Sequence, residues 1–414
     1  MDIRIEPGML SGTVKIPSSK SVTHRLLICA ALAEGVSVVE GVSFSKDIEA
    51  TMEALCALGA DFAVEGERVT VTGIGGKKPN TAVSMDCYES GSTLRFLIPV
   101  AAALGVNATF YGQGRLPQRP ITTYIRELSK NGITFDYQNT MPFSISGQLT
   151  AGEYCLEGDV SSQYVTGLLL ALPLLKGDSV IRMLSPLQSR PYVDLTIACM
   201  RQYGFAVTEL PDGYAVKGNQ KPKACHTAAE GDYSQAAFFC VANALGSHVK
   251  MENLSLESVQ GDKKIVEIAD TMCYNKKAGK PACFDVDATD IPDLVPILAV
   301  LGTFGDAVSR ITGAARLKIK ESDRLAAVSD MLNRLGGRVT AYEDGLEIEP
   351  VSSLHGGIVD SFGDHRIAMC AAIAATRCTE PVTILHGECV EKSYPQFYED
   401  YNQLGGNAHV VVLE

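Results

Sequence analysis

The chain of 414 residues contains no tryptophan, and aromatic residues make up only 7% of it. It also has no long apolar run, since stretches such as 168–175 are far shorter than the roughly 20 residues that a membrane helix needs. The first six residues, from Met1 to Glu6, do not place an apolar segment behind a basic start, as a signal peptide would. These absences predict a cytoplasmic protein that does not insert into a membrane.

Positive charge is also scarce overall. The chain has 36 Lys and Arg against 48 Asp and Glu, a formal net charge of −12. This balance argues against a surface that binds nucleic acid or an anionic membrane, so any anion site must gather its cations locally. The apolar fraction of 46% is that of a globular protein, and the length predicts two domains.

Several chemical motifs are missing as well. The twelve cysteines include no C-x-x-C pair and the seven histidines are not clustered, so neither a zinc site nor another metal is expected. Reduced, mostly buried thiols are the simpler interpretation. No G-x-x-x-x-G-K-[ST] loop or nucleophile elbow is present, which argues against a nucleotide kinase and a serine hydrolase. We expect no cofactor.

What the sequence does contain is a repeat. Six segments are rich in small and aliphatic residues, and most of them end at a glycine. Such segments predict helices that are buried on all sides. They cover 22–35, 93–105, 164–177, 236–246, 294–305 and 367–379. A polar group opens each one, with markers at Ser21, Ser92, Ser162, Ser234, Asp293 and His365. The markers are about 70 residues apart, except for one step of about 60 between Ser234 and Asp293.

A second, amphipathic segment recurs out of phase with the first. Its copies cover 47–59, 122–132, 192–204, 262–275, 322–336 and 398–405, and short β-type stretches follow, such as 68–72. One copy therefore reads as a strand, a buried helix, a strand, an amphipathic helix and a strand pair. We predict an α/β fold of two inside-out domains, each of three repeats with helices inside and sheets outside, and a cleft between them. The domains would be 1–18 with 229–414, and 19–228; a single closed α/β barrel fits less well.

Three of the helix openings suit anions. Ser18–Ser21, Ser90–Ser92 and Ser161–Gln163 place hydroxyl, glycine or lysine groups at a helix N-terminus, where N–H donors and a partial positive charge favour phosphate or carboxylate. Plain helix capping is the better interpretation of any single opening. Cations nearby strengthen the case for anion binding: Lys20, Arg25, Arg95, Arg366, the Arg115–Pro120 loop and the charged run Lys318–Arg324.

These motifs together resemble the family of 3-phosphoshikimate 1-carboxyvinyltransferase, also called enolpyruvylshikimate-phosphate synthase. Residues 17–25, 90–95, 115–120, 320–325 and 364–366 carry the resemblance, which runs from Gly12 to Pro395. It implies transfer of the enolpyruvyl group of phosphoenolpyruvate to the 5-hydroxyl of shikimate 3-phosphate, with phosphate released, in the shikimate pathway of chorismate and aromatic amino acid biosynthesis. It also implies two inside-out domains and inhibition by glyphosate.

The resemblance assigns residues to each substrate. For shikimate 3-phosphate they are Ser21, Arg25, Ser161, Ser162, Gln163, Ser189, Tyr192, Asp293, Arg316 and Lys320. For phosphoenolpyruvate they are Lys20, Gly91, Arg115, Gln163, Arg324, Arg366 and Lys392. Two positions depart from the common pattern, because Glu89 and Arg316 stand where many relatives have Asn. Glu89 could weaken the grip on an anion or pair with a nearby Arg, so it bears on sensitivity to glyphosate.

The reaction needs an acid and a base in one site, and cations that hold two anionic substrates together. Our hypothesis is that Asp293 takes the hydroxyl proton and Glu321 delivers a proton to the methylene carbon. Lys20 and Lys392 would stabilise the departing phosphate. A helix cap for Asp293 and a helix-surface ion pair for Glu321 are equally good interpretations of the spacing alone.

Two other functions remain open at this point. The related enzyme that acts on UDP-N-acetylglucosamine usually carries a reactive cysteine in the loop that is Gln113–Pro120 here, and this loop has none. A non-catalytic anion-binding sensor would gain nothing from the carboxylates of Asp293 and Glu321. We expect small anionic substrates as the partners, no nucleic acid or membrane, and a monomer whose halves are brought together first by shikimate 3-phosphate.

Overall fold

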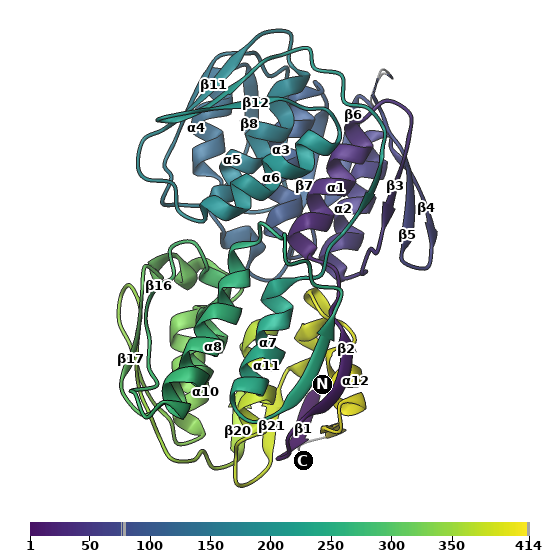
Figure 1. Ribbon diagram of the computed structural model, residues 1–414. Coiled ribbons are helices and arrows are strands. Elements are labelled where there is room, and N and C mark those ends of the chain that lie inside the picture. Colours follow the sequence, from purple (N-terminus) through teal and green to yellow (C-terminus); the bar gives the residue numbers. More distant parts are fainter. Residues whose placement is uncertain (76, 78–79, 412–414) are drawn as a thin grey trace. The chain divides into compact units, whose positions relative to one another are not determined.

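The computed structural model describes residues 1–75, 77 and 80–411 in two compact units (Figure 1). Residues 412–414 of the predicted domain 1–18 with 229–414, and residues 76, 78 and 79 of the predicted domain 19–228, lie outside the described residues. The N-terminal unit comprises Ser18–Glu230, and the C-terminal unit comprises Met1–Pro17 with Gly231–Glu414. Each unit has its own hydrophobic core of buried aliphatic and aromatic side chains.

One repeat of the N-terminal unit shows the pattern of the others. Its order is β6 (Ala82–Asp86), α3 (Gly91–Ala103), β7 (Asn107–Tyr111), α4 (Thr122–Lys130), β8 (Ile133–Asp136) and β9 (Phe143–Gly147). Strand β6 is parallel to β7, and β9 lies antiparallel between β7 and β8. The strand, buried helix, strand, amphipathic helix and strand pair read from the sequence are all present, which confirms the predicted α/β repeat.

The other two repeats of this unit have the same strand order. One contains β10 (Glu153–Leu156), α5 (Ser162–Ala171), β11 (Ser179–Met183), α6 (Arg190–Gln202), β12 (Val207–Leu210) and β13 (Gly213–Val216). The other contains α1 (Lys20–Leu32), β3 (Val36–Glu40), α2 (Lys46–Leu58), β4 (Asp61–Glu65) and β5 (Arg68–Thr72). Its first strand, β14 (His226–Ala228), comes from the far end of the unit and pairs parallel to β3.

The C-terminal unit has two such repeats and a shorter one. The first complete repeat contains β16 (Asp285–Asp287), α9 (Val295–Thr303), β17 (Ser309–Thr312), α10 (Arg324–Arg334), β18 (Arg338–Ala341) and β19 (Leu346–Glu349). The second contains β20 (Gly357–Asp360), α11 (His365–Ala375), β21 (Val382–Leu385), α12 (Phe397–Gln403) and β22 (Asn407–Val411), and its sheet is completed by β1 (Asp2–Glu6) from the start of the chain. The short repeat contains β2 (Ser11–Lys15), α7 (Tyr233–Ala244), β15 (His248–Glu252) and α8 (Lys264–Lys277).

The short repeat corrects one expectation. The sequence predicts a strand pair in all six copies, whereas among the described residues β2 and β15 form a sheet of two strands only. The chain passes from α8 to β16 without a hairpin, and this missing pair accounts for the shorter step between Ser234 and Asp293. The absence of a strand pair leaves little trace in the local composition of the sequence. Only the shorter spacing between the two helix openings indicates it.

The first helix of each repeat is buried because it carries small and aliphatic side chains on all of its faces. Every residue of α11 is buried, as is every residue of α1 from Val22 to Leu32. Side chains cap five of these helices at their first turn, with Ser19, Ser90, Ser161, Asp232 and Asp364 as acceptors. The described helices are all too short or too polar to cross a lipid bilayer.

Candidate functional site

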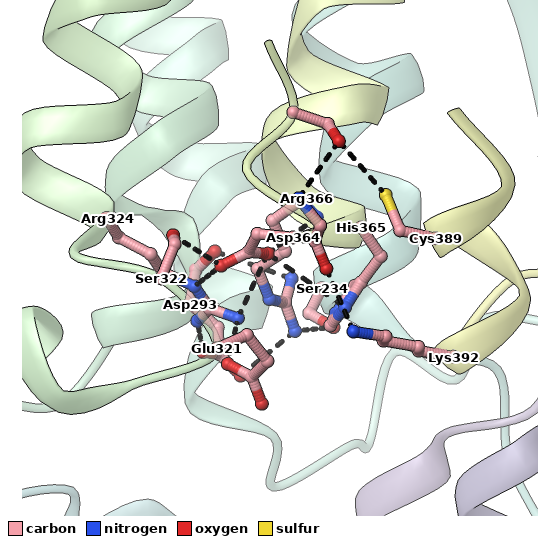
Figure 2. A network of polar contacts seen from close by, with 12 residues as sticks. Ser234, Asp293, Glu321, Ser322, Arg324, Asp364, His365, Arg366, Cys389 and Lys392 are labelled. Carbon is pink, nitrogen blue, oxygen red and sulfur yellow. Dashed lines mark hydrogen bonds and ion pairs between the residues drawn. The ribbon is translucent and has the colours of Figure 1, made fainter. Parts of the chain in front are cut away.

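Arg324 is the centre of a buried ionic network in the C-terminal unit. It begins α10, and only 2% of its side chain is exposed. Its Nη1 lies 2.8 Å from Asp293 Oδ1, its Nη2 lies 2.7 Å from Glu321 Oε2, and its Nε lies 2.8 Å from Asp364 Oδ2 (Figure 2). Burial alone lowers the pKa of Arg324, but the three carboxylates outweigh burial and raise it. The guanidinium is a fixed positive charge that joins three segments.

Asp293 lies in the turn that precedes α9, and it is held by a second arginine. Its Oδ2 lies 2.9 Å from Nη2 of Arg366, which also donates to Ser234 Oγ at 3.1 Å. Burial raises the pKa of Asp293, but the charges of Arg366, Lys320 and Arg324 outweigh burial and hold it below its usual value. The helix-cap interpretation of Asp293 does not hold, because the N-cap position of α9 is Leu294, without a side-chain cap bond, and the Asp293 carboxylate forms ion pairs.

Lys320 follows the short helical turn η5 (Ala315–Ile319) and faces the same carboxylate. Burial lowers the pKa of Lys320 to about 8, and the charges of Arg324 and Arg316 act in the same direction, while Asp293 and Glu321 oppose them. Arg316 donates a hydrogen bond to the carbonyl oxygen of Thr289, in the loop that leads to Asp293. The arginine that departs from the common pattern thus connects two segments of this cluster.

Glu321 and Lys392 complete the set in this unit. Glu321 lies before the start of α10 with 16% of its side chain exposed, so its ion pair with Arg324 is not one on an open helix surface. Lys392 ends the turn η6 (Gly387–Lys392), and its Nζ donates to the carbonyl oxygen of Gly363 at 2.9 Å. Gly363 precedes Asp364, the cap of α11, so Lys392 is held beside the helix start that carries Arg366 (Figure 2).

The N-terminal unit holds a second group of cations, at the start of α1. Lys20 is the first residue of the helix, and its Nζ lies 2.7 Å from Asp47 Oδ2 on α2. Arg25 is buried and donates to Thr196 Oγ1, to the Tyr192 carbonyl and to the Ser21 carbonyl at 2.7, 3.0 and 2.6 Å. Burial lowers the pKa of Arg25 to about 10, so it remains charged at neutral pH.

A third group surrounds the start of α3. A Cβ atom placed on Gly91 would lie 2.6 Å from Nη1 of Arg119, 3.3 Å from Nη1 of Arg95 and 3.4 Å from Oε1 of Gln163. Gln163 accepts from Arg95 at 2.7 Å and donates to Ser92 Oγ at 3.1 Å. Two guanidinium groups and the starts of α3 and α5 therefore converge on Gly91, which is an arrangement suited to an anion.

The Arg115–Pro120 loop and Glu89 lie near the cations that surround Gly91. Arg119 is buried beside Gly91, whereas Arg115, which the family resemblance assigns to phosphoenolpyruvate, is exposed. Glu89 lies against the same loop, because a Cβ atom on Gly114 would be 2.4 Å from its Oε2. The carboxylate of Glu89 is therefore held at the base of the Arg115 loop.

The serines assigned to shikimate 3-phosphate belong to α5 and α6. Ser161 Oγ accepts from the Gln163 N–H at 3.3 Å, which confirms helix capping, and Ser162 is buried in the first turn. Ser189 has a φ of 55°, in the left-handed region that costs a non-glycine residue about 1–3 kcal/mol. Its carbonyl accepts from the N–H of Tyr192 at 3.0 Å.

Several residues of these groups were not assigned from the sequence. The sequence indicates Arg95 and Arg119 only as nearby cations, and it predicts no partner for Asp47, Asp364 or Ser234. Asp47 is 27 residues from Lys20, and Asp364 is 40 residues from Arg324, distances at which no helix or strand period applies. In the described part of the chain, no group of three or more His, Cys, Asp or Glu side chains is placed to hold a metal ion.

Comparisons with known proteins fit this arrangement. A family model described as EPSP synthase (3-phosphoshikimate 1-carboxyvinyltransferase) matches residues 5–401. Relatives named 3-phosphoshikimate 1-carboxyvinyltransferase include one from Clostridium kluyveri, 44% identical over 98% of this chain and 97% of its own, and one from Clostridium acetobutylicum, 42% identical over 98% of both. A solved structure of EPSP synthase from Acinetobacter baumannii has a TM-score of 0.81 at 27% identity, covering 99% of this chain and all of that one.

The family match spans nearly the whole chain, and the similarity extends to the three-dimensional structure. The chain belongs to the EPSP synthase (3-phosphoshikimate 1-carboxyvinyltransferase) family.

Proposed function

We propose that the chain transfers the enolpyruvyl group of phosphoenolpyruvate to the 5-hydroxyl of shikimate 3-phosphate and releases phosphate. Family membership supports this reaction, and the observation that carries it is the buried network in which Arg324 and Arg366 hold Asp293. Carboxylates placed among cations suit a reaction that moves protons between anions. The rival substrate UDP-N-acetylglucosamine is not favoured by the family match.

The chemistry requires two steps that balance. The oxygen of the 5-hydroxyl bonds to the central carbon of phosphoenolpyruvate, while the hydroxyl proton leaves and another proton joins the methylene carbon. The bond from that central carbon to the phosphate oxygen then breaks, and a proton leaves the methyl group to restore the double bond. The site must therefore hold one base, one acid and a stabilised leaving group.

Asp293 is our candidate base and Glu321 our candidate acid. Arg324 and Arg366 keep Asp293 ionised, which makes it an acceptor but also a weak base. An anionic substrate on these two arginines would offset part of their charge, and the pKa of Asp293 would then rise. Binding of phosphoenolpyruvate would in this way prepare the base for the hydroxyl proton.

The remaining assignments follow the residues as grouped above. We propose that Lys20, Gly91, Arg115, Gln163, Arg324, Arg366 and Lys392 bind phosphoenolpyruvate, and that Lys20 and Lys392 stabilise the departing phosphate. Shikimate 3-phosphate would be bound by Ser21, Arg25, Ser161, Ser162, Gln163, Ser189, Tyr192, Asp293, Arg316 and Lys320. The contacts around Gly91 support adding Arg119 to the first set. Glyphosate is expected to compete with phosphoenolpyruvate.

A phosphate-release assay tests the function directly. The purified chain is incubated with phosphoenolpyruvate and either shikimate 3-phosphate or UDP-N-acetylglucosamine, and mass spectrometry identifies the product. Release only with shikimate 3-phosphate is the expected result. Release only with the nucleotide sugar, or binding of both anions without release, would replace the proposal by one of its two rivals.

The cellular setting is part of the proposal. All twelve cysteines are free thiols, which supports a reducing compartment such as the cytoplasm. We propose that the chain acts there as a monomer. Sedimentation at several protein concentrations tests this, because a mass that rises with concentration would contradict it.

A further inference from the structure

His24 lies in the N-terminal unit, one helical turn after Lys20, and the reaction outlined above does not use it. Its side chain is fully buried, and its Nδ1 lies 2.8 Å from Thr51 Oγ1 on α2. The edge of one ring meets the face of the other between His24 and Phe96 of α3. The histidine therefore contacts residues of both α2 and α3.

A chain of buried hydroxyl groups continues from His24 to the start of α3. Thr51 Oγ1 lies 2.6 Å from Thr93 Oγ1, and Thr93 Oγ1 donates to Ser90 Oγ at 2.7 Å. Thr51 and Thr93 are fully buried and Ser90 is 1% exposed. We call Thr51, Thr93 and Ser90 the hydroxyl chain.

The hydroxyl chain reaches the two places in this unit where cations or helix N–H groups could hold an anion, at Gly91 and at Lys20. Ser90 caps α3, whose first residue is Gly91. The carbonyl oxygen of Asp47, whose carboxylate holds Lys20, lies 3.2 Å from Thr51 Oγ1 and 3.4 Å from Thr93 Oγ1, as an alternative acceptor for either hydroxyl. One set of hydrogen bonds thus connects the N-terminal halves of α1, α2 and α3.

The charge and the tautomer of His24 together set the direction of its bond to Thr51. Burial lowers the pKa of His24 well below its usual value, and the charges of Lys20 and Arg25 lower it further, so the imidazole is neutral. Its Nε2 is buried without a polar partner in the described part of the chain. With the proton on Nδ1, only an acceptor stays unpaired, and each hydroxyl can accept from one neighbour and donate to the next.

We propose that His24 is a positioning residue: through the hydroxyl chain it holds the starts of α1 and α3 where Lys20 and Gly91 can bind one anion, and it directs the Ser90 hydroxyl away from Thr93. The proposal rests on the proposed function, because it takes that anion to be phosphoenolpyruvate. The alternative is a histidine that fills the core without affecting the site.

Variants that each remove one polar side-chain group separate these two interpretations. Thr51→Val removes the hydroxyl at nearly constant volume, and His24→Leu removes the imidazole. His24→Asn keeps a polar group close to the position of Nδ1. Thr227→Val is the matched control, since Thr227 is buried and bonded to Tyr203 at 3.2 Å in the same unit but outside the hydroxyl chain.

Steady-state kinetics and calorimetry give the readouts. We expect Thr51→Val and His24→Leu to raise KM for phosphoenolpyruvate about 10-fold, while the Kd for shikimate 3-phosphate alone changes less than about 2-fold. His24→Asn should restore KM to near the wild-type value with an unchanged pH profile. Thr227→Val should leave KM unchanged, whatever it does to stability.

The outcomes are distinct. An unchanged KM in Thr51→Val, or a loss in His24→Asn as large as in His24→Leu, overturns the role of His24 while leaving the proposed function intact. Should His24→Leu fail to fold, Thr51→Val and Thr93→Val carry the same comparison. A wild-type chain without turnover on shikimate 3-phosphate overturns the proposed function itself, and the role of His24 with it.

Discussion

The carboxylate of Asp293 lies 2.9 Å from the guanidinium of Arg366, although the two residues are 73 positions apart in the chain. Arg324 holds the other carboxylate oxygen at 2.8 Å. A candidate base that two arginines keep ionised can act only when something offsets their charge. The ion pair between Asp293 and Arg366 therefore links substrate binding to proton transfer. Mutation of Asp293 should separate the effect on binding from the effect on proton transfer.

Replacing Asp293 by Asn should abolish turnover while sparing binding. The amide keeps the shape of the side chain but cannot take up a proton, so kcat should fall by about 10²–10⁴-fold. The Kd for shikimate 3-phosphate, measured by calorimetry, should change far less. Asp330→Asn on the exposed face of α10 is the control and should keep full activity. Near-normal kcat in Asp293→Asn would remove Asp293 from the role of base.

Affinity for shikimate 3-phosphate should fall as pH rises through about 8. Lys320, whose pKa is lowered to about 8, carries its charge below that pH and loses it above. The ligand contributes little to this step, because the second pKa of a phosphate monoester is about 6. Calorimetric titrations from pH 6.5 to 9.5, roughly bracketing that pKa, measure the effect. Lys320→Arg stays charged and should remove the step.

Arg316 offers an independent check on the same step. Its charge lowers the pKa of Lys320, so Arg316→Asn should raise that pKa and move the loss of affinity to higher pH. Arg310→Asn, at an exposed pair with Glu347, serves as the control and should leave the midpoint where it is. A midpoint that does not move in Arg316→Asn would show that Lys320 does not control the step.

Removing the centre of the ionic network should destabilise the chain strongly. Arg324→Met leaves Asp293, Glu321 and Asp364 without their shared cation, and breaking a buried ion pair costs about 3–5 kcal/mol. Urea denaturation measures the change. Arg334→Met, which breaks an exposed pair on the same helix, should cost less than about 1 kcal/mol. Equal losses in the two variants would mean that the buried network contributes no more than the surface pair.

Adding one methyl group at Gly91 should weaken binding of phosphoenolpyruvate. The new Cβ atom would lie 2.6 Å from Nη1 of Arg119 and must displace it. We expect Gly91→Ala to raise KM for phosphoenolpyruvate and the inhibition constant of glyphosate, with the Kd for shikimate 3-phosphate nearly unchanged. Gly204→Ala, where a Cβ atom meets nothing within 4 Å, tests the effect of a methyl group away from the site, although its φ of 82° adds backbone strain. Unchanged kinetics in Gly91→Ala would exclude this position from the substrate site.

The sequence by itself determined the features that depend on neighbours along the chain. The apolar character of α1 or α11 predicts burial on all sides, and Ser90, Ser161 and Asp364 were recognisable as caps because a cap acts within three residues. The recurrence of such segments predicted the repeat, its order of elements and the α/β class. The motifs that contain Lys20 and Arg324 identified the family for the same reason, since each motif is contiguous.

The tertiary structure decided what depends on residues far apart. It brought Arg119 rather than Arg115 beside Gly91, paired Lys20 with Asp47, and left the short repeat without its strand pair. Charge state belongs here too, because the pKa of Lys320 depends on burial and on charges from other segments. Side chains from separate helices meet only when the cores of a unit pack, and no period along the chain records which of them will do so.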